Sequence, residues 1–200
     1  MSSAFVEPRV TDLLDSLAGV ISYPGPDYEE VVDRACHRAA DQKEIATLME
    51  SFRNEIAGLS GDQIEELFTR TFDLNPVAAL DVGWHLWGDA YERGRFLSTV
   101  RGWLFEEGIV ENGELPDHLT HLLPLLGRLE ERRAIELVRY VRSSFEKIRK
   151  PFAETDNPYR HVLDAIEGLV DAEFPTTDDI SVPGSPSAIG AGHQPYEVKQ

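Results

Sequence analysis

The chain has 200 residues, a hydrophobic content of 42% and a formal net charge of -17 at pH 7. This length suits one domain with a sizeable core. The negative charge disfavours binding to nucleic acids and to anionic membrane surfaces, and it favours a basic partner. The single cysteine, Cys36, excludes an intramolecular disulfide. Because no signal peptide is visible and no segment has the ~20 apolar residues of a membrane span, we expect a cytoplasmic protein.

The first third of the chain shows apolar residues at the spacing of amphipathic helices. Thr11 can cap a first helix that stops at Tyr23-Pro24, because proline disfavours helix at the residue before it. We expect a second helix capped by Asp27, a third from about Glu44, and a fourth that opens with the capping box Ser60-Gly61-Asp62-Gln63 and ends at Asn75-Pro76.

The helical spacing continues through the rest of the chain as far as Phe174. We expect a short helix from Val77 to Trp87, one from Asp89 to Gly108, a loop at 109–115, one with Pro116 in its first turn, one at 130–150, and a last one from Asn157-Pro158. The fold class is therefore predicted as all-α, a single-domain bundle of roughly eight helices over residues 1–174. Residues 175–200 are rich in proline and glycine and read as a disordered or extended tail.

The end of the fourth predicted helix is the first candidate site. Phe68 and Phe72 are one helical turn apart and should share the buried face. Asp73 follows at the helix C-terminus, where the helix dipole disfavours an anion. Asp73 therefore either caps the next helix or is presented to a ligand, and composition alone favours the cap.

The second candidate site is the stretch Glu114 to Leu119. Asp117 follows Pro116 in the predicted first helical turn, where the dipole favours a carboxylate. His118 is adjacent and His121 lies one turn further on. The alternative is a helix N-terminus with solvent-facing histidines. Between the two sites, Trp84 and Trp87 stand at helical spacing, which favours a core position over a cofactor site.

These motifs resemble the two signatures of the redox-enzyme maturation chaperones of the NarJ/TorD family. Members carry a glutamate, a tyrosine, an apolar residue and a Phe-Asp pair, which Glu66, Phe68, Thr71 and Phe72-Asp73 match, with Phe68 and Thr71 as departures. They also carry a Leu-Pro-Asp-His-Leu string, which is present in full at Leu115 to Leu119.

The segment between the motifs resembles the nitrate-reductase branch of that family, through His85, Gly88-Asp89 and Arg93-Gly94. The likeness runs from about Leu67 to Leu126. A glutamate that usually follows the second motif is replaced by Pro124, which puts the role of that glutamate in doubt here and can kink the helix.

The resemblance implies a non-enzymatic chaperone with no stably bound cofactor. Its partner would be the immature catalytic subunit of a molybdenum oxidoreductase, with respiratory nitrate reductase as the expected client. It would bind the basic N-terminal segment of that subunit, a twin-arginine signal or its remnant, and keep the subunit open for molybdopterin guanine dinucleotide, which the client carries.

We expect a peptide-binding groove in which carboxylates face the cationic groups of the peptide and His118 is a hydrogen-bonding group that changes charge near neutral pH. The expected contact residues are Glu66, Phe68, Phe72, Asp73, Trp84, His85, Leu115, Pro116, Asp117 and His118.

Two other classes of function stay open from the sequence. One is a generic acidic helical adaptor or regulator that has no link to molybdenum enzymes. The other is a small hydrolase or metal-dependent enzyme built on His85, Asp117, His118 and His121. A zinc site normally needs three or four converging ligands, and no helix here has the spacing of a metalloprotease.

Overall fold

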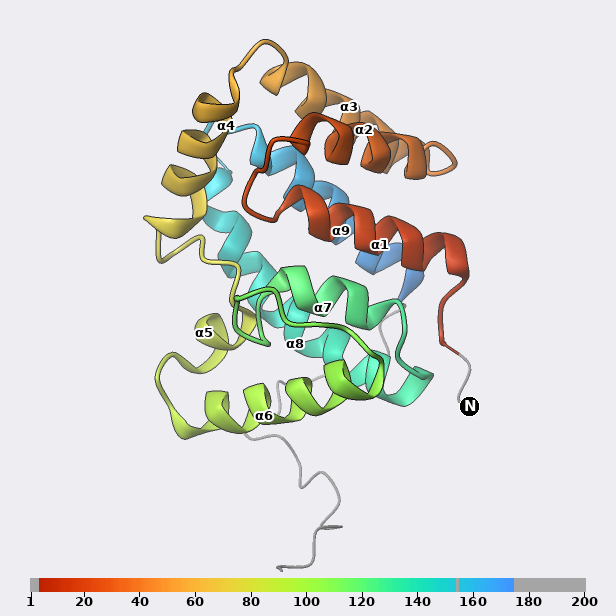
Figure 1. Ribbon diagram of the computed structural model, residues 1–200. Coiled ribbons are helices and arrows are strands. Elements are labelled where there is room, and N and C mark those ends of the chain that lie inside the picture. Colours follow the sequence, from red (N-terminus) through yellow and green to blue (C-terminus); the bar gives the residue numbers. More distant parts are fainter. Residues whose placement is uncertain (1–3, 154, 175–200) are drawn as a thin grey trace, which may run out of the picture.

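The computed structural model describes residues 4–153 and 155–174, and these residues form an all-α fold without strands (Figure 1). The α-helices are α1 (Pro8–Val20), α2 (Tyr28–Arg38), α3 (Lys43–Ile56), α4 (Gly61–Phe68), α5 (Val82–Trp87), α6 (Tyr91–Glu106), α7 (Leu119–Leu126), α8 (Glu131–Arg149) and α9 (Tyr159–Glu173). A π-helical turn, η1 (Thr69–Asp73), extends α4, and a 3-10 turn, η2 (Lys150–Phe152), extends α8. The predicted fold class is confirmed.

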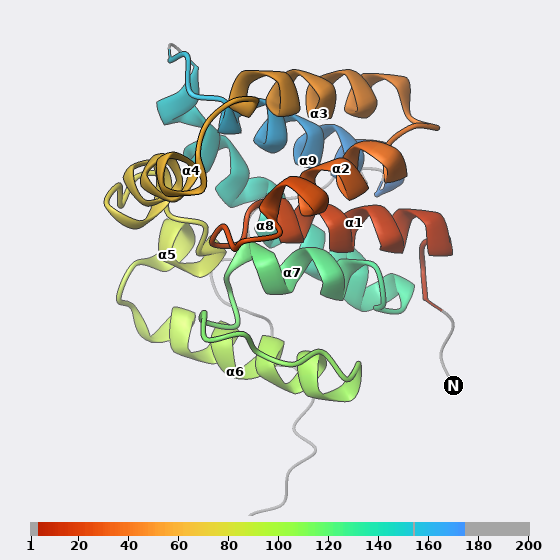
Figure 2. The same cartoon turned by 45° about the horizontal axis from the view of Figure 1, so that its top comes forward.

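Several helices pack against neighbours that lie far from them in the sequence, and α1 also packs on α2, which follows it directly. Helix α3 packs on α9, α1 on α2 and α7, and α5 on α8. Figures 1 and 2 show α3, α1, α7 and α6 following one another from top to bottom, with α4 and α5 together at one end. The apolar stripes of α1, α7, α8 and α9 supply most of the fully buried side chains, so these helices form the framework of the core.

Several helix boundaries differ from those predicted from the sequence. Helix α1 begins at Pro8, because proline is tolerated in a first turn where its missing amide hydrogen has no partner. Helix α5 begins at Val82 rather than Val77, and α6 begins at Tyr91 rather than Asp89. The capping box is confirmed, since the Ser60 hydroxyl accepts from Gln63 and the Gln63 side chain accepts from the Ser60 amide.

The prediction that Pro116 lies in the first turn of a helix is wrong. Helix α7 begins only at Leu119, and its N-cap is His118. Residues 115–118 form a turn in which the His118 amide donates to the Leu115 carbonyl at 3.0 Å, and His118 then pairs with Asp81, before α5, in an antiparallel bridge. The Val82 amide donates to the Asp117 carbonyl at 2.9 Å, and the Leu119 amide donates to the Leu80 carbonyl at 3.0 Å. This long-range pairing replaces the local helical turn.

Within the described residues, no helix is long and apolar enough to cross a membrane. The predicted tail, residues 175–200, lies outside the described residues.

Candidate functional site

The two sequence motifs meet at one recess of about 350 Å³ at the end of the molecule where α4 and α5 lie. The recess is formed by the segment after α1, the end of α4 with η1, the segment before α5, the loop before α7 and the start of α7. Its lining residues are Ile21, Ser22, Tyr23, Phe68, Phe72, Asp73, Ala79, Leu80, Asp81, Asn112, Glu114, His118 and Thr120. We call it the α4–α7 recess.

Aromatic rings form one wall of the α4–α7 recess. The rings of Phe68 and Phe72 are 5.1 Å apart, and the fully buried Tyr159 of α9 packs at 5.8 Å from the first and 4.9 Å from the second. Tyr23 lies edge-on to Phe68 at 5.6 Å and is 56% exposed. This wall is therefore anchored in the core by Tyr159 and ends at the surface with a tyrosine ring.

The π-helical turn η1 places Asp73 at the mouth of this wall. Thr71 is buried, and its hydroxyl donates to the Leu67 carbonyl at 2.6 Å and accepts from the Asn157 amide at 2.8 Å. Asp73 is exposed, and its carboxylate forms no hydrogen bond or ion pair with any other described residue. The described structure therefore does not show the cap that composition favoured, and the carboxylate stands open at the recess.

Arginine 93 holds the opposite wall together. Its guanidinium contacts the Asp117 carboxylate at 2.9 Å and 3.3 Å and the Asp81 carboxylate at 3.1 Å. Trp84 covers the guanidinium, whose central carbon is 5.7 Å from the indole ring centroid. The bridge between Asp81 and His118 ties this cluster to the start of α7.

The expectation that Asp117 faces a bound peptide is wrong for this structure. Its side chain is completely buried and engaged by Arg93, so it does not reach the surface of the recess. Burial raises the pKa of the Asp117 carboxyl above its usual value, and the hydrogen bond and charge of Arg93 oppose that shift. Asp117 therefore contacts its neighbours in the protein rather than a ligand.

His118 lines the recess but does not act as a switch near neutral pH. The Thr120 amide donates to its Nδ1 at 3.3 Å, which caps α7 and leaves the ring proton of the neutral form on Nε2. Burial, together with the neighbouring His121, lowers the pKa of His118 to about 4. The ring is thus neutral above about pH 5, and Nε2 has no hydrogen-bond partner among the described residues.

The alternative of solvent-facing histidines is also wrong, because both rings are buried. His121 accepts from the Asn112 amide at 3.1 Å through Nε2 and contacts the Leu115 carbonyl at 3.0 Å through Nδ1. These two contacts fold the loop before α7 onto the helix and thereby bring Asn112 and Glu114 to the recess.

Of the ten predicted contact residues, Phe68, Phe72, Asp73 and His118 line the recess and the other six do not. Glu66 forms an ion pair with Arg70 on the exposed side of α4. Trp84 is 36% exposed rather than a core residue, and His85 bonds to the Ala79 carbonyl behind the recess wall. Leu115 is exposed, whereas Pro116 is buried and Asp117 lies behind the wall.

Sequence reasoning did not single out Tyr23 or Asp81 as site residues, although both line the recess. Tyr23 served only as a helix stop, and Asp81 belongs to no motif. Three lining residues are carboxylates, namely Asp73, Asp81 and Glu114, and none of the lining residues is a lysine or arginine. This arrangement suits a cationic group with an apolar neighbour.

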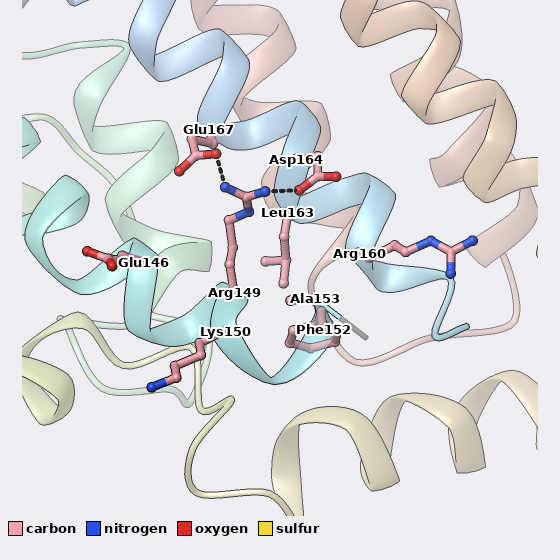
Figure 3. Close-up of a pocket in the computed structure, with 9 residues that line it drawn as sticks. All are labelled: Glu146, Arg149, Lys150, Phe152, Ala153, Arg160, Leu163, Asp164 and Glu167. Atoms are coloured by element: carbon pink, nitrogen blue, oxygen red, sulfur yellow. Dashed lines mark hydrogen bonds and ion pairs between the residues drawn. The ribbon is translucent and has the colours of Figure 1, made fainter. Parts of the chain in front are cut away.

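A larger hollow of about 530 Å³ lies between the end of α8 and the start of α9 (Figure 3). Arg149 reaches between Asp164 and Glu167 there, and Arg160 pairs with Glu55. Lys150 points away from these pairs (Figure 3). Because both of its arginines are already paired and none of the predicted contact residues lines it, size alone does not make this hollow the functional site.

The residues suggested for a metal-dependent enzyme do not converge on one point. Among residues 4–153 and 155–174, no group of three or more His, Cys, Asp or Glu side chains is placed to hold a metal ion. Both ring nitrogens of His121 contact backbone groups, and Asp117 is engaged by Arg93.

No model of a protein family matches the chain, and a search of curated proteins found no match either.

Proposed function

We propose that this protein is a cytoplasmic chaperone for the immature catalytic subunit of a molybdenum oxidoreductase of the nitrate reductase type. It binds the basic N-terminal segment of that subunit in the α4–α7 recess. The client, not the chaperone, carries the molybdopterin guanine dinucleotide, and the chaperone keeps the client open until that cofactor is inserted. The two sequence motifs are the source of this assignment.

The observation that carries the proposal is the charge and surface of the recess at which both motifs meet. Asp73, Asp81 and Glu114 offer three carboxylates without a lining cation. The segment between Asp73 and Ala79 exposes two large apolar side chains, Leu74 at 72% and Val77 at 62%. A cationic amphipathic segment fits both features, because its charges face the carboxylates and its apolar side covers the exposed leucine and valine.

The proposed mechanism is capture and release without covalent chemistry. The net charge of -17 raises the encounter rate with a basic segment over a Debye length of about 8 Å. The carboxylates of the recess then fix the position of the cationic side chains, and the aromatic wall and the exposed apolar residues retain the segment. While the segment is held, the client is neither exported nor docked at the membrane.

Binding of a synthetic client peptide tests the proposal. Isothermal titration calorimetry would compare the N-terminal peptide of a nitrate-reductase-type catalytic subunit on the native protein and on Asp73→Asn/Glu114→Gln. We expect the variant to bind roughly tenfold more weakly, which corresponds to about 1.4 kcal/mol. The loss should shrink as sodium chloride is raised, because exposed charges are screened.

A matched control removes the same two charges elsewhere. Asp62 and Glu44 are exposed and lie outside the recess, on α4 and α3, and have no ion pair among the described residues. Asp62→Asn/Glu44→Gln should keep the affinity within about twofold of the native value, since both changes leave the recess intact. Equal affinities in all three proteins, or equal losses in both variants, would contradict binding at the recess.

A further inference from the structure

The three side chains of the Asp81–Arg93–Asp117 cluster differ in how exposed they are and in how many contacts they make to one another. The side chain of Asp117 is 0% exposed, that of Arg93 15% and that of Asp81 26%. Asp117 makes two contacts to the guanidinium, through Nε and Nη2, whereas Asp81 makes one through Nη2. Only Asp81 lines the α4–α7 recess.

The cluster therefore carries one net negative charge, and its accessible end is Asp81. Burial lowers the pKa of the Arg93 guanidinium, but the hydrogen bond to Asp117 and the charges of Asp117, Asp81 and Asp89 together outweigh burial, and the pKa is raised. Arg93 is thus always charged, and Asp117 compensates that charge. Without Asp117, the charge of Arg93 would instead compensate the charge of Asp81.

The backbone at Gly83 makes this arrangement possible. A side chain there would place its Cβ 2.5 Å from Oδ2 of Asp117 and 3.1 Å from Cγ of Arg93. The ring of Trp84, the next residue, lies against the guanidinium, with its centroid 5.7 Å from the central carbon. Arg93 is therefore held by a buried carboxylate, a ring and a close backbone, and it is not free to turn toward the recess.

We propose that Asp81 is a specificity-determining contact for a cationic side chain in the recess, and that Asp117 and Arg93 are positioning residues, because Asp117 compensates the charge of Arg93 and so leaves the charge of Asp81 available. Asp117 acts without touching the ligand, because it takes up the charge of Arg93. This inference rests on the proposed function for the identity of the ligand, and it assigns the second motif a role in setting the charge of the recess.

The test is a charge-restoration series measured by peptide binding. Asp117→Asn removes the neutralising charge, so Arg93 cancels Asp81 and affinity for an arginine-containing peptide should fall about fivefold to tenfold. Asp117→Asn/Arg93→Gln removes both of these charges and leaves the Asp81 carboxylate without the arginine beside it, so affinity should return to within about twofold of the native value. Adding Asp81→Asn to that double variant should weaken binding again to the level of the first variant.

The series separates charge from folding. Thermal unfolding followed by circular dichroism checks that each variant is folded, and if Asp117→Asn alone is not folded, the double and triple variants decide the question by themselves. Recovery in the double variant and loss in the triple variant support the proposal. A double variant that binds as weakly as the triple variant would overturn it, because Asp117 would then act by contact or by shape.

Two probes distinguish this inference from the proposed function. One is the N-terminal peptide of the reductase subunit, and the other is a scrambled peptide of the same composition. If only the scrambled peptide follows the series, the proposed client is wrong and the charge-setting role stands. If the reductase peptide binds the native protein but its affinity ignores the series, the charge-setting role is wrong and the client stands. Absence of binding by both peptides overturns both.

Discussion

Among single residues, Gly83 lies so close to the Asp117 carboxylate that a side chain at position 83 has no room. The Asp117 carboxylate is fully buried, and a Cβ at position 83 would meet it at 2.5 Å. A buried carboxylate that loses its arginine partner costs several kcal/mol, so any displacement of Asp117 or Arg93 is expensive. Position 83 therefore tests the cluster without changing any charge.

Gly83→Ala should destabilise the protein by about 1–3 kcal/mol, because the added methyl group overpacks the Asp117–Arg93 contact. The measurement is the free energy of unfolding from urea denaturation. Gly94→Ala is the matched control, since Gly94 lies in α6 and a Cβ there meets nothing within 4 Å. That control should be neutral or stabilising by up to about 1 kcal/mol, and an equal cost at both positions would argue against the close contact.

His118 gives a pH dependence whose sign follows from its burial. Its pKa falls from 6.5 in the unfolded chain to about 4 in the folded protein, so the unfolded chain binds more protons between these values. The folded state therefore loses stability as the pH drops from about 6.5 toward 4, by at most roughly 3 kcal/mol.

The variant His118→Asn isolates this contribution, because asparagine also caps a helix and does not titrate. Unfolding free energies measured at pH 7 and pH 5 should differ less in His118→Asn than in the native protein. An identical difference in both proteins would show that other groups account for the acid sensitivity.

Among the secondary-structure elements, the π-helical turn η1 differs most from regular helix in its hydrogen bonds. A π-helical turn is rare and tends to occur at functional sites. Here the Thr71 hydroxyl donates to the Leu67 carbonyl and accepts a hydrogen bond from the side-chain amide of Asn157, in the segment before α9. Thr71, which stands where the resembling family has an apolar residue, thus uses its hydroxyl to join the turn to the segment before α9.

Thr71→Val should destabilise the protein by about 1–3 kcal/mol, because the isosteric side chain leaves the Asn157 amide and the buried turn without their partner. Thr71→Ser keeps the hydroxyl and should cost clearly less. Urea denaturation of the three proteins measures both effects. A serine variant as unstable as the valine variant would assign the cost to packing of the methyl group instead.

The sequence predicted the helical elements where their signals are local. The capping box at Ser60 and Gln63 and the stop at Tyr23-Pro24 needed only neighbouring residues, and the structure places α4 and the end of α1 accordingly. The start of α7 could not be predicted this way, because the pairing of Asp117 and Leu119 with Leu80 and Val82 joins segments that are far apart in the chain.

The candidate site could be predicted from the sequence only where its residues belong to local motifs. Phe68, Phe72, Asp73 and His118 were found because they belong to motifs. The burial of Asp117 was missed because its partner, Arg93, comes from another helix. Asp81 was missed because nothing in its neighbours marks it, and only the fold gives it a place at the recess.

For the whole molecule, the excess of acidic residues leaves some carboxylates without a basic partner. The chain has 36 acidic and 19 basic residues. Arginines of α6, α8 and α9 are largely engaged in ion pairs with acidic neighbours in the described parts of the chain. The carboxylates of Asp73 and Glu114 have no such partner there, so net charge alone could favour a basic partner but could not indicate the place that we propose for it.

The bridge between Asp81 and His118 limits how far the recess can deform. Two backbone hydrogen bonds fasten the segment before α5 to the segment before α7, and each contributes about 1 kcal/mol. An entering group cannot wedge these segments apart without breaking both bonds together. Widening the recess at this side therefore costs roughly 2 kcal/mol, which the binding free energy of any group that forces the two segments apart would have to supply.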